Sequence, residues 1–139
     1  EGGIDVKRNH NILGTIIGRL KKNNIRVSLF VDSSIDQIKL AKELGSDIIE
    51  IHAGEFCRKV HDRLDFQKEL NTIKEAASFA ESIGLETHVG HGVTFDSIVE
   101  LSKINEVREF NIGHFIISES LFLGLETTIK KMKTLIAEG

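Results

Sequence analysis

The sequence predicts an α/β fold in which parallel strands alternate with helices. Two observations support this prediction: short β-branched runs recur four times along the chain, and segments with a helical spacing of apolar residues separate them. Strands that alternate with helices pair in parallel through right-handed crossovers. No low-complexity linker interrupts residues 1–139, so we expect one domain without an internal boundary.

The four expected strands are short and mostly β-branched, a composition that suits the buried surface of a sheet. Gly, Asn or Asp residues bound them, as is typical of buried strands. The predicted strands are Ile25–Val31 (IRVSLFV), Asp47–His52 (DIIEIH), Leu85–Gly90 (LETHVG) and Glu109–Gly113 (EFNIG).

Helical patterns precede the first strand and follow every strand. The first pattern stops at Asn23-Asn24, and two later patterns stop at Gly45 and Gly84, which are typical helix ends. The expected order is therefore one helix followed by four strand–helix units. Apolar residues recur at helical spacing over residues 12–20, 35–44, 70–83, 98–104 and 129–136.

Two local signals lie between these elements. Ser34 stands three residues before Gln37, which is the spacing of a capping box at the start of a helix. The charged segment Glu55–Asp65 (EFCRKVHDRLD) is expected to be a solvent-exposed loop, and long loops on an active face can act as lids.

The composition is that of a soluble globular protein. Of the 139 residues, 40% are hydrophobic and 28% are charged, which is enough for a real core. The 18 Lys and Arg residues are dispersed among 21 acidic residues, without the basic block of a nucleic-acid-binding protein. No apolar run approaches the roughly 18 residues of a membrane span and no signal peptide opens the chain, so a cytoplasmic location is expected. Cys57 is the single cysteine, which excludes an internal disulfide.

The periodicity leaves two architectures open, a doubly wound open sheet and one half of a TIM (β/α)8 barrel. Polar residues at the C-terminal ends of all four strands favour the barrel, because barrel enzymes carry their chemistry on that face. Such enzymes often hold phosphate with the loops after the last two strands and a short extra helix, which residues 113–124 (GHFIISESLFLG) could supply. The polar residues are Asp32, Glu50, His52, His91 and His114.

Two Gly-His pairs indicate an anion site. Gly90 and Gly92 flank His91, so the backbone is open to a ligand and free to adopt positive φ. Backbone N–H groups of such a turn, together with the N-terminus of the helix expected to begin near residue 94, favour an anion. Gly113 and His114 repeat the arrangement. An imidazole beside a bound phosphate is favoured in its cationic form, which makes His91 a candidate general acid.

The other polar residues divide into candidates and ordinary positions. Glu50 and His52 lie on the same side of their strand, and a carboxylate at a barrel mouth is costly unless it has a function. In an open sheet Glu50 could instead form a salt bridge with a covering helix. Asp32 either belongs to the site or only begins the next loop. Exposure to solvent or packing is expected for His10, His61, His88 and Cys57.

Five short segments occur in a recognisable order: EGGIDV, VSLFVD, IEIHAG, HVGHGVTFD and NIGHFII. Together they resemble the signatures of the pyridoxine 5'-phosphate synthase family, barrel enzymes that close the pyridine ring in the deoxyxylulose-phosphate-dependent route to vitamin B6. The resemblance covers essentially all 139 residues. It implies that residues 1–139 are the C-terminal half of a single barrel domain, with roughly strands 5 to 8 and their helices. The start at EGGIDV, without an initiating Met, fits a fragment.

The resemblance implies a transferase that needs no metal or organic cofactor. The family condenses 3-amino-2-oxopropyl phosphate with 1-deoxy-D-xylulose 5-phosphate and releases phosphate and water. His91 matches the family's proton donor, and Gly92 matches a backbone contact to the aminoketone phosphate. Gly113 and His114 match the pair that holds the same phosphate, and Glu50 matches a carboxylate that stabilises cationic or polar transition states.

The resemblance also bears on assembly. It implies a homo-oligomer, with an octamer as the state suggested by the family, and partners limited to phosphorylated small molecules. The family's general bases and the arginines that bind deoxyxylulose phosphate fall on strands outside this chain. The isolated fragment is therefore expected to be inactive. We expect it to associate through two open sheet edges and an apolar inner face.

Two other classes of function remain open. A metal-dependent phosphosugar epimerase or isomerase barrel would use Asp32, His52 and His91 as ligands, because imidazole and carboxylate suit a divalent metal. The glycines on both sides of His91 favour an anion over a metal, and metal analysis of the pure protein would discriminate. The second alternative is a non-catalytic half-barrel that binds phosphates or a partner chain.

Overall fold

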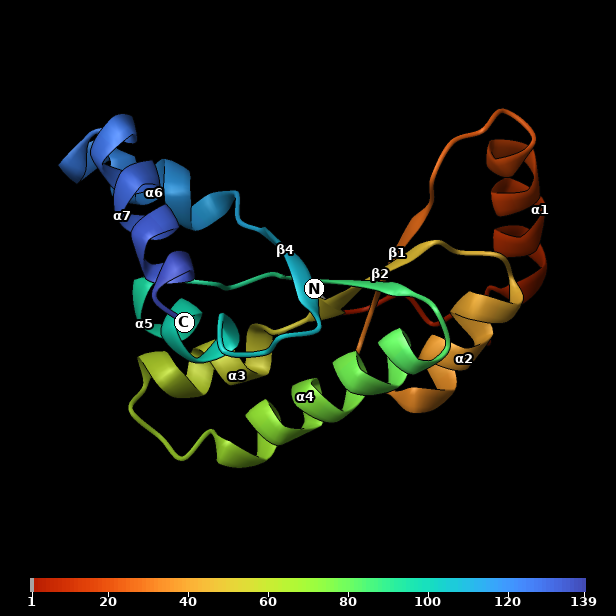
Figure 1. The fold of residues 1–139 in the computed structure, drawn as a ribbon, viewed down its shortest axis with the longest axis horizontal. Helices are drawn as coiled ribbons and strands as arrows, with labels where there is room; N and C mark the ends of the chain where they lie inside the picture. The colour runs from red at the N-terminus through yellow and green to blue at the C-terminus, as the bar shows by residue number, and fades with distance from the viewer. Residues whose placement is uncertain (1) are drawn as a thin grey trace.

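A computed structural model describes residues 2–139 and shows one parallel sheet flanked by helices (Figure 1). The strands are β1 (Ser28–Val31), β2 (Ile48–His52), β3 (Glu86–Gly90) and β4 (Val107–Asn111). The helices are α1 (His10–Lys21), α2 (Ile35–Glu43), α3 (Gly54–His61), α4 (Gln67–Ser82), α5 (Phe95–Leu101), α6 (His114–Leu123) and α7 (Leu125–Ala137).

The order of strands in the sheet decides between the two predicted architectures. The sheet runs β1-β2-β3-β4, and each neighbouring pair is parallel. A doubly wound sheet reverses its strand order at a switch point, whereas consecutive units of a (β/α)8 barrel follow one another in sequence order. The chain is therefore an α/β protein with the strand order of half a TIM barrel.

One face of the sheet forms the core. Alternate residues of the strands, among them Val31, Ile49, Ile51 and Val89, are fully buried on this face. Figure 1 shows α2, α3 and α4 on this side of the sheet, and residues of α2 and α4 contact the strands. The apolar stripe of α4 lies here too, as the spacing of its apolar residues predicts.

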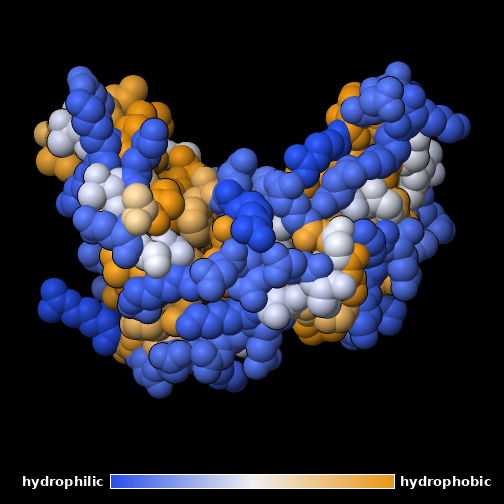
Figure 2. Space-filling view, viewed as in Figure 1, coloured by the Kyte–Doolittle hydropathy of each residue, from blue (hydrophilic) through white to orange (hydrophobic). Residues whose placement is uncertain are grey.

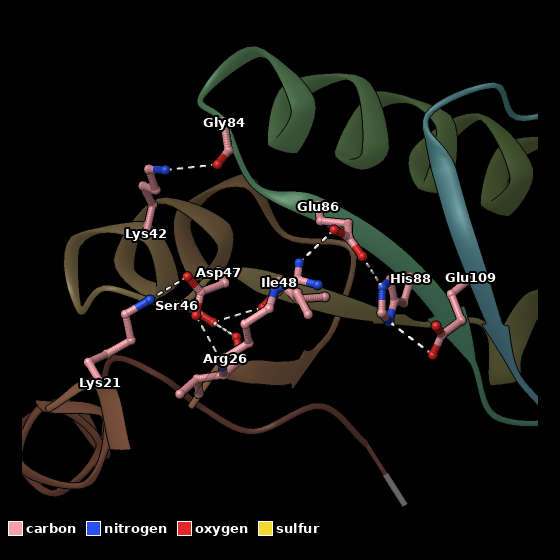
Figure 3. A network of polar contacts seen from close by, with 11 residues as sticks. Lys21, Arg26, Lys42, Ser46, Asp47, Ile48, Gly84, Glu86, His88 and Glu109 are labelled. Atoms are coloured by element: carbon pink, nitrogen blue, oxygen red, sulfur yellow. Dashed lines mark hydrogen bonds and ion pairs between the residues drawn. The ribbon is translucent and has the colours of Figure 1, made fainter. Parts of the chain in front are cut away.

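The opposite face of the sheet carries polar side chains. His88 Nε2 lies 2.8 Å from Glu86 Oε1, and His88 Nδ1 lies 3.5 Å from Glu109 Oε1 (Figure 3). Arg26 donates a 2.6 Å hydrogen bond to the second oxygen of Glu86. The hydrogen bond from His88, followed by that from Arg26, lowers the pKa of Glu86. The prediction of an apolar inner face is therefore wrong, because ion pairs occupy this side of the sheet.

The capping prediction for α2 is also wrong. Ser34 is the N-cap, but its side chain makes no capping hydrogen bond. Gln37 instead accepts a 2.7 Å hydrogen bond from the Val6 N–H and so ties the N-terminal segment to α2. The Gln37 side chain, which the local spacing assigned to the cap, makes this long-range contact instead.

Residues 55–65 are not a loop as predicted, because α3 covers most of them. Phe56 and Cys57 are buried beneath the sheet's C-terminal edge, while the charged Arg58 lies on the outside of the helix. The Phe56 ring packs edge-on against Phe66, with ring centroids 5.4 Å apart. Only the end of the segment, after His61, lies outside the helix.

Apolar side chains are exposed near both edges of the sheet. Ile12 on α1 is 60% exposed, and Leu121 and Phe122 on α6 are 82% and 85% exposed. Figure 2 shows hydrophobic patches over α1 and over the α6–α7 pair, with a hollow between them. In residues 2–139 no helix combines the length and apolar character needed to cross a membrane.

Candidate active site

A cavity of about 760 Å³ opens at the C-terminal ends of the strands. Both Gly-His pairs line this cavity, although residues 91 and 114 lie on different loops. The fold therefore brings together all five residues that the sequence nominated for catalysis or substrate binding. They are Glu50, His91, Gly92, Gly113 and His114.

The turn after β3 presents His91 to the cavity. His91 has φ +67° and Gly92 has φ +78°, so the positive φ predicted for this loop is confirmed. The left-handed region is costly for a residue with a side chain, and such conformations cluster at functional sites. The imidazole is exposed, which leaves it accessible to a ligand in the cavity.

The second Gly-His pair does not repeat this geometry. Gly113 has φ −105° and is the N-cap of α6, and His114 is the first helical residue. The first turn of α6 has no acidic residue and no side-chain cap hydrogen bond. The positive end of the helix dipole is therefore open to an anion at the cavity.

The helix after the first pair is a poorer anion site than the sequence suggested. Thr94, the N-cap of α5, accepts a hydrogen bond from the Ser97 N–H at 3.3 Å. The Ser97 hydroxyl oxygen accepts one from the Thr94 N–H at 2.8 Å, which completes a capping box. Asp96 adds a negative charge to this first turn. Of the two helix N-termini near the cavity, that of α6 therefore offers the more favourable environment for an anion.

Glu50 is oriented by two neighbours in the sheet. The Asn111 amide of β4 donates a 2.8 Å hydrogen bond to Glu50 Oε2. A Cβ atom at Gly90 would lie 2.1 Å from Glu50 Oε1, so only glycine admits this carboxylate beside β3. The sequence suggested ligand approach as the reason for Gly90, and it did not single out Asn111. The position of Asn111 at the end of the fourth strand was the available signal.

Asp32 and His52 lie beside His91. Asp32 Oδ1 is 3.3 Å from His52 Nδ1, and the ring centroids of His52 and His91 are 4.8 Å apart. Within residues 2–139 no three His, Cys, Asp or Glu side chains are grouped so that they could hold a metal ion. The donor geometry therefore adds no support to the metal-dependent alternative.

The remaining histidines and the cysteine are not among the residues that line the cavity. His10 and His61 are exposed on helices, while His88 is buried in the polar network of the inner face. Cys57 is buried on α3, and burial raises the pKa of its thiol to about 11.

The sequential parallel sheet, with a polar cavity at the C-terminal ends of its strands, defines the chain as half of a barrel of the kind found in (β/α)8 enzymes. The model of the family described as pyridoxal phosphate biosynthesis protein PdxJ matches residues 1–138. The chain belongs to the PdxJ family.

Curated relatives in three bacteria are named pyridoxine 5'-phosphate synthase. The protein of Sulfurihydrogenibium sp. (strain YO3AOP1) is 43% identical over 136 residues, which cover 98% of this chain and 55% of the relative. That of Roseobacter denitrificans is 41% identical, covering 98% of this chain and 55% of the relative. That of Coxiella burnetii is 42% identical, covering 99% of this chain and 57% of the relative. The chain spans about half the length of these relatives.

Proposed function

We propose that this chain is the C-terminal half of a pyridoxine 5'-phosphate synthase barrel. In the complete enzyme, 3-amino-2-oxopropyl phosphate condenses with 1-deoxy-D-xylulose 5-phosphate to give pyridoxine 5'-phosphate, phosphate and water. The observation that carries the proposal is that Glu50, His91 and the N-terminus of α6 face one cavity. Membership of the PdxJ family supports the same reading.

The phosphate of the aminoketone binds between Gly92 and the start of α6. The uncapped N–H groups of the first helical turn attract an anion, with each such interaction contributing about 0.3–1 kcal/mol at an exposed site. His114 adds an imidazole at the same end of α6. Gly92 carries no Cβ, so the phosphate oxygens can approach its backbone N–H closely.

His91 acts as general acid. Its exposed ring lies in the cavity beside the proposed phosphate position, where a nearby anion favours the imidazolium form. An imidazolium can transfer a proton to the oxygen of a departing group and so avoid release of a free oxyanion or hydroxide.

Glu50 supplies a fixed negative charge. Its hydrogen bond from Asn111 sets the direction of the carboxylate towards the cavity before substrate binds. Such preorganisation stabilises positive charge that develops on the aminoketone nitrogen during condensation, because no solvent must reorganise at that moment.

Every role assigned here belongs to a side chain or a backbone group, so the proposal includes no metal or organic cofactor. The homo-oligomeric state and the cytoplasmic location stay predictions from the sequence. The general bases that complete the reaction belong to the part of the barrel outside these residues.

The test is the substitution His91→Asn in the complete enzyme. Turnover should fall on the order of 10²-fold or more while the Michaelis constant for the aminoketone phosphate changes little, because a general acid acts in the transition state. His61→Asn is the matched control, since His61 is exposed at the end of α3. Unchanged turnover with a raised Michaelis constant would show that His91 only binds substrate.

A further inference from the structure

The His52 side chain lies between Asp32 and His91. Its Nδ1 faces Asp32 Oδ1 at 3.3 Å, and its ring packs at a tilt against His91 with centroids 4.8 Å apart. The Phe30 ring contacts both imidazoles, edge-on to His52 at 5.3 Å and tilted to His91 at 6.3 Å. The exposed His91 ring is thus packed against the rings of His52 and Phe30.

The N-terminal segment fixes Asp32 in turn. The Gly3 N–H donates a 3.0 Å hydrogen bond to Asp32 Oδ1, the same oxygen that faces His52. A Cβ atom at Gly3 would lie 2.2 Å from the Asp32 backbone nitrogen, so glycine is required for this approach. The Ile4 N–H also donates to the Phe30 carbonyl at 2.7 Å. The EGGIDV segment therefore connects with the cavity through Asp32.

The orientation of the His52 ring determines which of its two nitrogens borders the space next to His91. A carboxylate beside Nδ1 favours a hydrogen atom on that nitrogen, which leaves the lone pair of the neutral ring on Nε2. Nε2 is buried and has no hydrogen-bond partner. A Cβ atom at Gly54 would lie 2.6 Å from His52 Nε2 and 3.0 Å from His91 Cδ2, so both atoms border the same small space.

We infer that Asp32 and His52 are positioning residues for His91: Asp32 holds the His52 ring, and His52 holds the His91 imidazole in its reactive orientation. This inference rests on the proposed role of His91 as general acid. Gly54 leaves the space in which the two rings meet.

Charged residues also lie on a second side of His52. A smaller cavity of about 290 Å³ is lined by His52 and Asp32 together with Glu55 of α3 and Lys68 and Glu69 of α4. Glu69 is paired with Lys59 at 2.8 Å, and the Lys59 hydrogen bond lowers the pKa of the Glu69 carboxyl. Asp32 is therefore the acidic group in direct contact with His52 Nδ1.

The experiment is a double-mutant cycle in the complete enzyme with Asp32→Asn, His52→Phe and the double variant. Phe keeps a flat ring in place of His52 and removes both nitrogens. Each single variant should lower turnover about tenfold to a hundredfold with little change in the Michaelis constant for the aminoketone phosphate. The double variant should be no worse than His52→Phe alone, because Asp32 acts through His52.

Two matched controls share the chemistry of these changes. Asp36→Asn removes an exposed charge from the first turn of α2, and His61→Phe replaces an exposed histidine. Both should retain wild-type turnover. Additive losses in the double variant would overturn the inference, because Asp32 and His52 would then act independently. Full turnover of His52→Phe would also overturn it, because ring packing alone would then be sufficient.

A second readout separates this inference from the proposed function. Imidazole ¹⁵N shifts of His91 report its tautomer and hydrogen bonding without any reaction. They should change in His52→Phe and Asp32→Asn and stay unchanged in both controls. Unchanged shifts in all variants would overturn the positioning role even if His91→Asn abolishes turnover. Full turnover of His91→Asn would show that His91 is not the general acid. Changed His91 shifts in His52→Phe and Asp32→Asn would still support the positioning of its ring by these two residues.

Discussion

At the scale of single residues, position in the fold determines whether a reactive group is used. Cys57 lies close to the turn that carries His91, because a Cβ atom at Gly92 would contact Cys57 Cβ at 3.3 Å. His91 faces the cavity, whereas Cys57 is buried on the far side of the turn. Desolvation raises the pKa of the Cys57 thiol to about 11 and outweighs the opposing hydrogen bond with Ser97.

We predict that folded protein resists thiol reagents at pH 8 and reacts only when it unfolds.

The raised pKa of Cys57 also predicts a pH effect on stability. Between pH 9 and 11 the unfolded chain loses the thiol proton that the folded chain keeps, so stability falls as the pH rises. From pH 8 to pH 10 the contribution should fall by ~1 kcal/mol, measured by chemical denaturation.

Cys57→Ser is the control for this effect, since a serine hydroxyl does not titrate in this range. The alkaline loss of stability should shrink in that variant by the amount assigned to the thiol. Rapid labelling of folded wild-type protein would show that Cys57 is accessible and that the argument from burial is wrong.

At the scale of elements, the sequence predicts the strands and helices that a pattern of neighbouring residues specifies. The four strands lie within a few residues of their predicted positions because β-branched runs bounded by turn residues specify them. Helix α3 was missed because only two of its eight residues, Phe56 and Cys57, are buried, which leaves too short an apolar pattern to recognise. Helix α6 begins at the predicted Gly-His pair, yet its backbone differs from that of the first pair.

The same distinction applies to the candidate site. The sequence predicts the two Gly-His pairs because they follow strands whose C-terminal ends meet at one edge of a parallel sheet, and it predicts Glu50 because a carboxylate inside a strand is unusual. The pairing of Asn111 with Glu50 joins positions 61 residues apart. The contact of Gly3 with Asp32 joins positions 29 apart. Contacts of this kind depend on the folded arrangement and leave no local pattern.

The packing of α3 can be tested with Phe56→Ala. Phe56 is 1% exposed and packs edge-on against Phe66, so truncation should leave a cavity under the sheet's C-terminal edge. We expect a loss of about 3–5 kcal/mol in the free energy of unfolding of the complete enzyme. Leu64→Ala just after α3 is the matched control, because Leu64 is 53% exposed and its truncation should cost little. Equal effects of the two substitutions would contradict the buried helix.

At the scale of the whole molecule, the chain has the shape of an unfinished barrel. Strands β1 and β4 form the two edges of the sheet, and each has one neighbour in the described residues 2–139. Exposed apolar residues flank these edges on α1 and on α6. The alignment with relatives covers about 55% of their length, which matches the share of a barrel that four strands supply.

We therefore predict that residues 1–139, produced alone, associate and make no pyridoxine 5'-phosphate. Open edges and exposed apolar helices drive association, although the inner face is polar. Sedimentation should show dimers or larger species, and replacing Leu121 and Phe122 by Lys should reduce them, whereas Glu119→Lys on the same helix should not. A cooperatively unfolding monomer would show that the sheet needs no further strands.

The proposed phosphate site is open to one direct observation, the structure of the complete enzyme with bound 3-amino-2-oxopropyl phosphate. Its phosphate should lie within hydrogen-bond distance of the Gly92 N–H and of the first N–H groups of α6, with the His91 imidazole beside the reacting atoms. A phosphate bound elsewhere in the barrel, out of reach of both Gly92 and Gly113, would contradict the proposed site and the role of His91 with it.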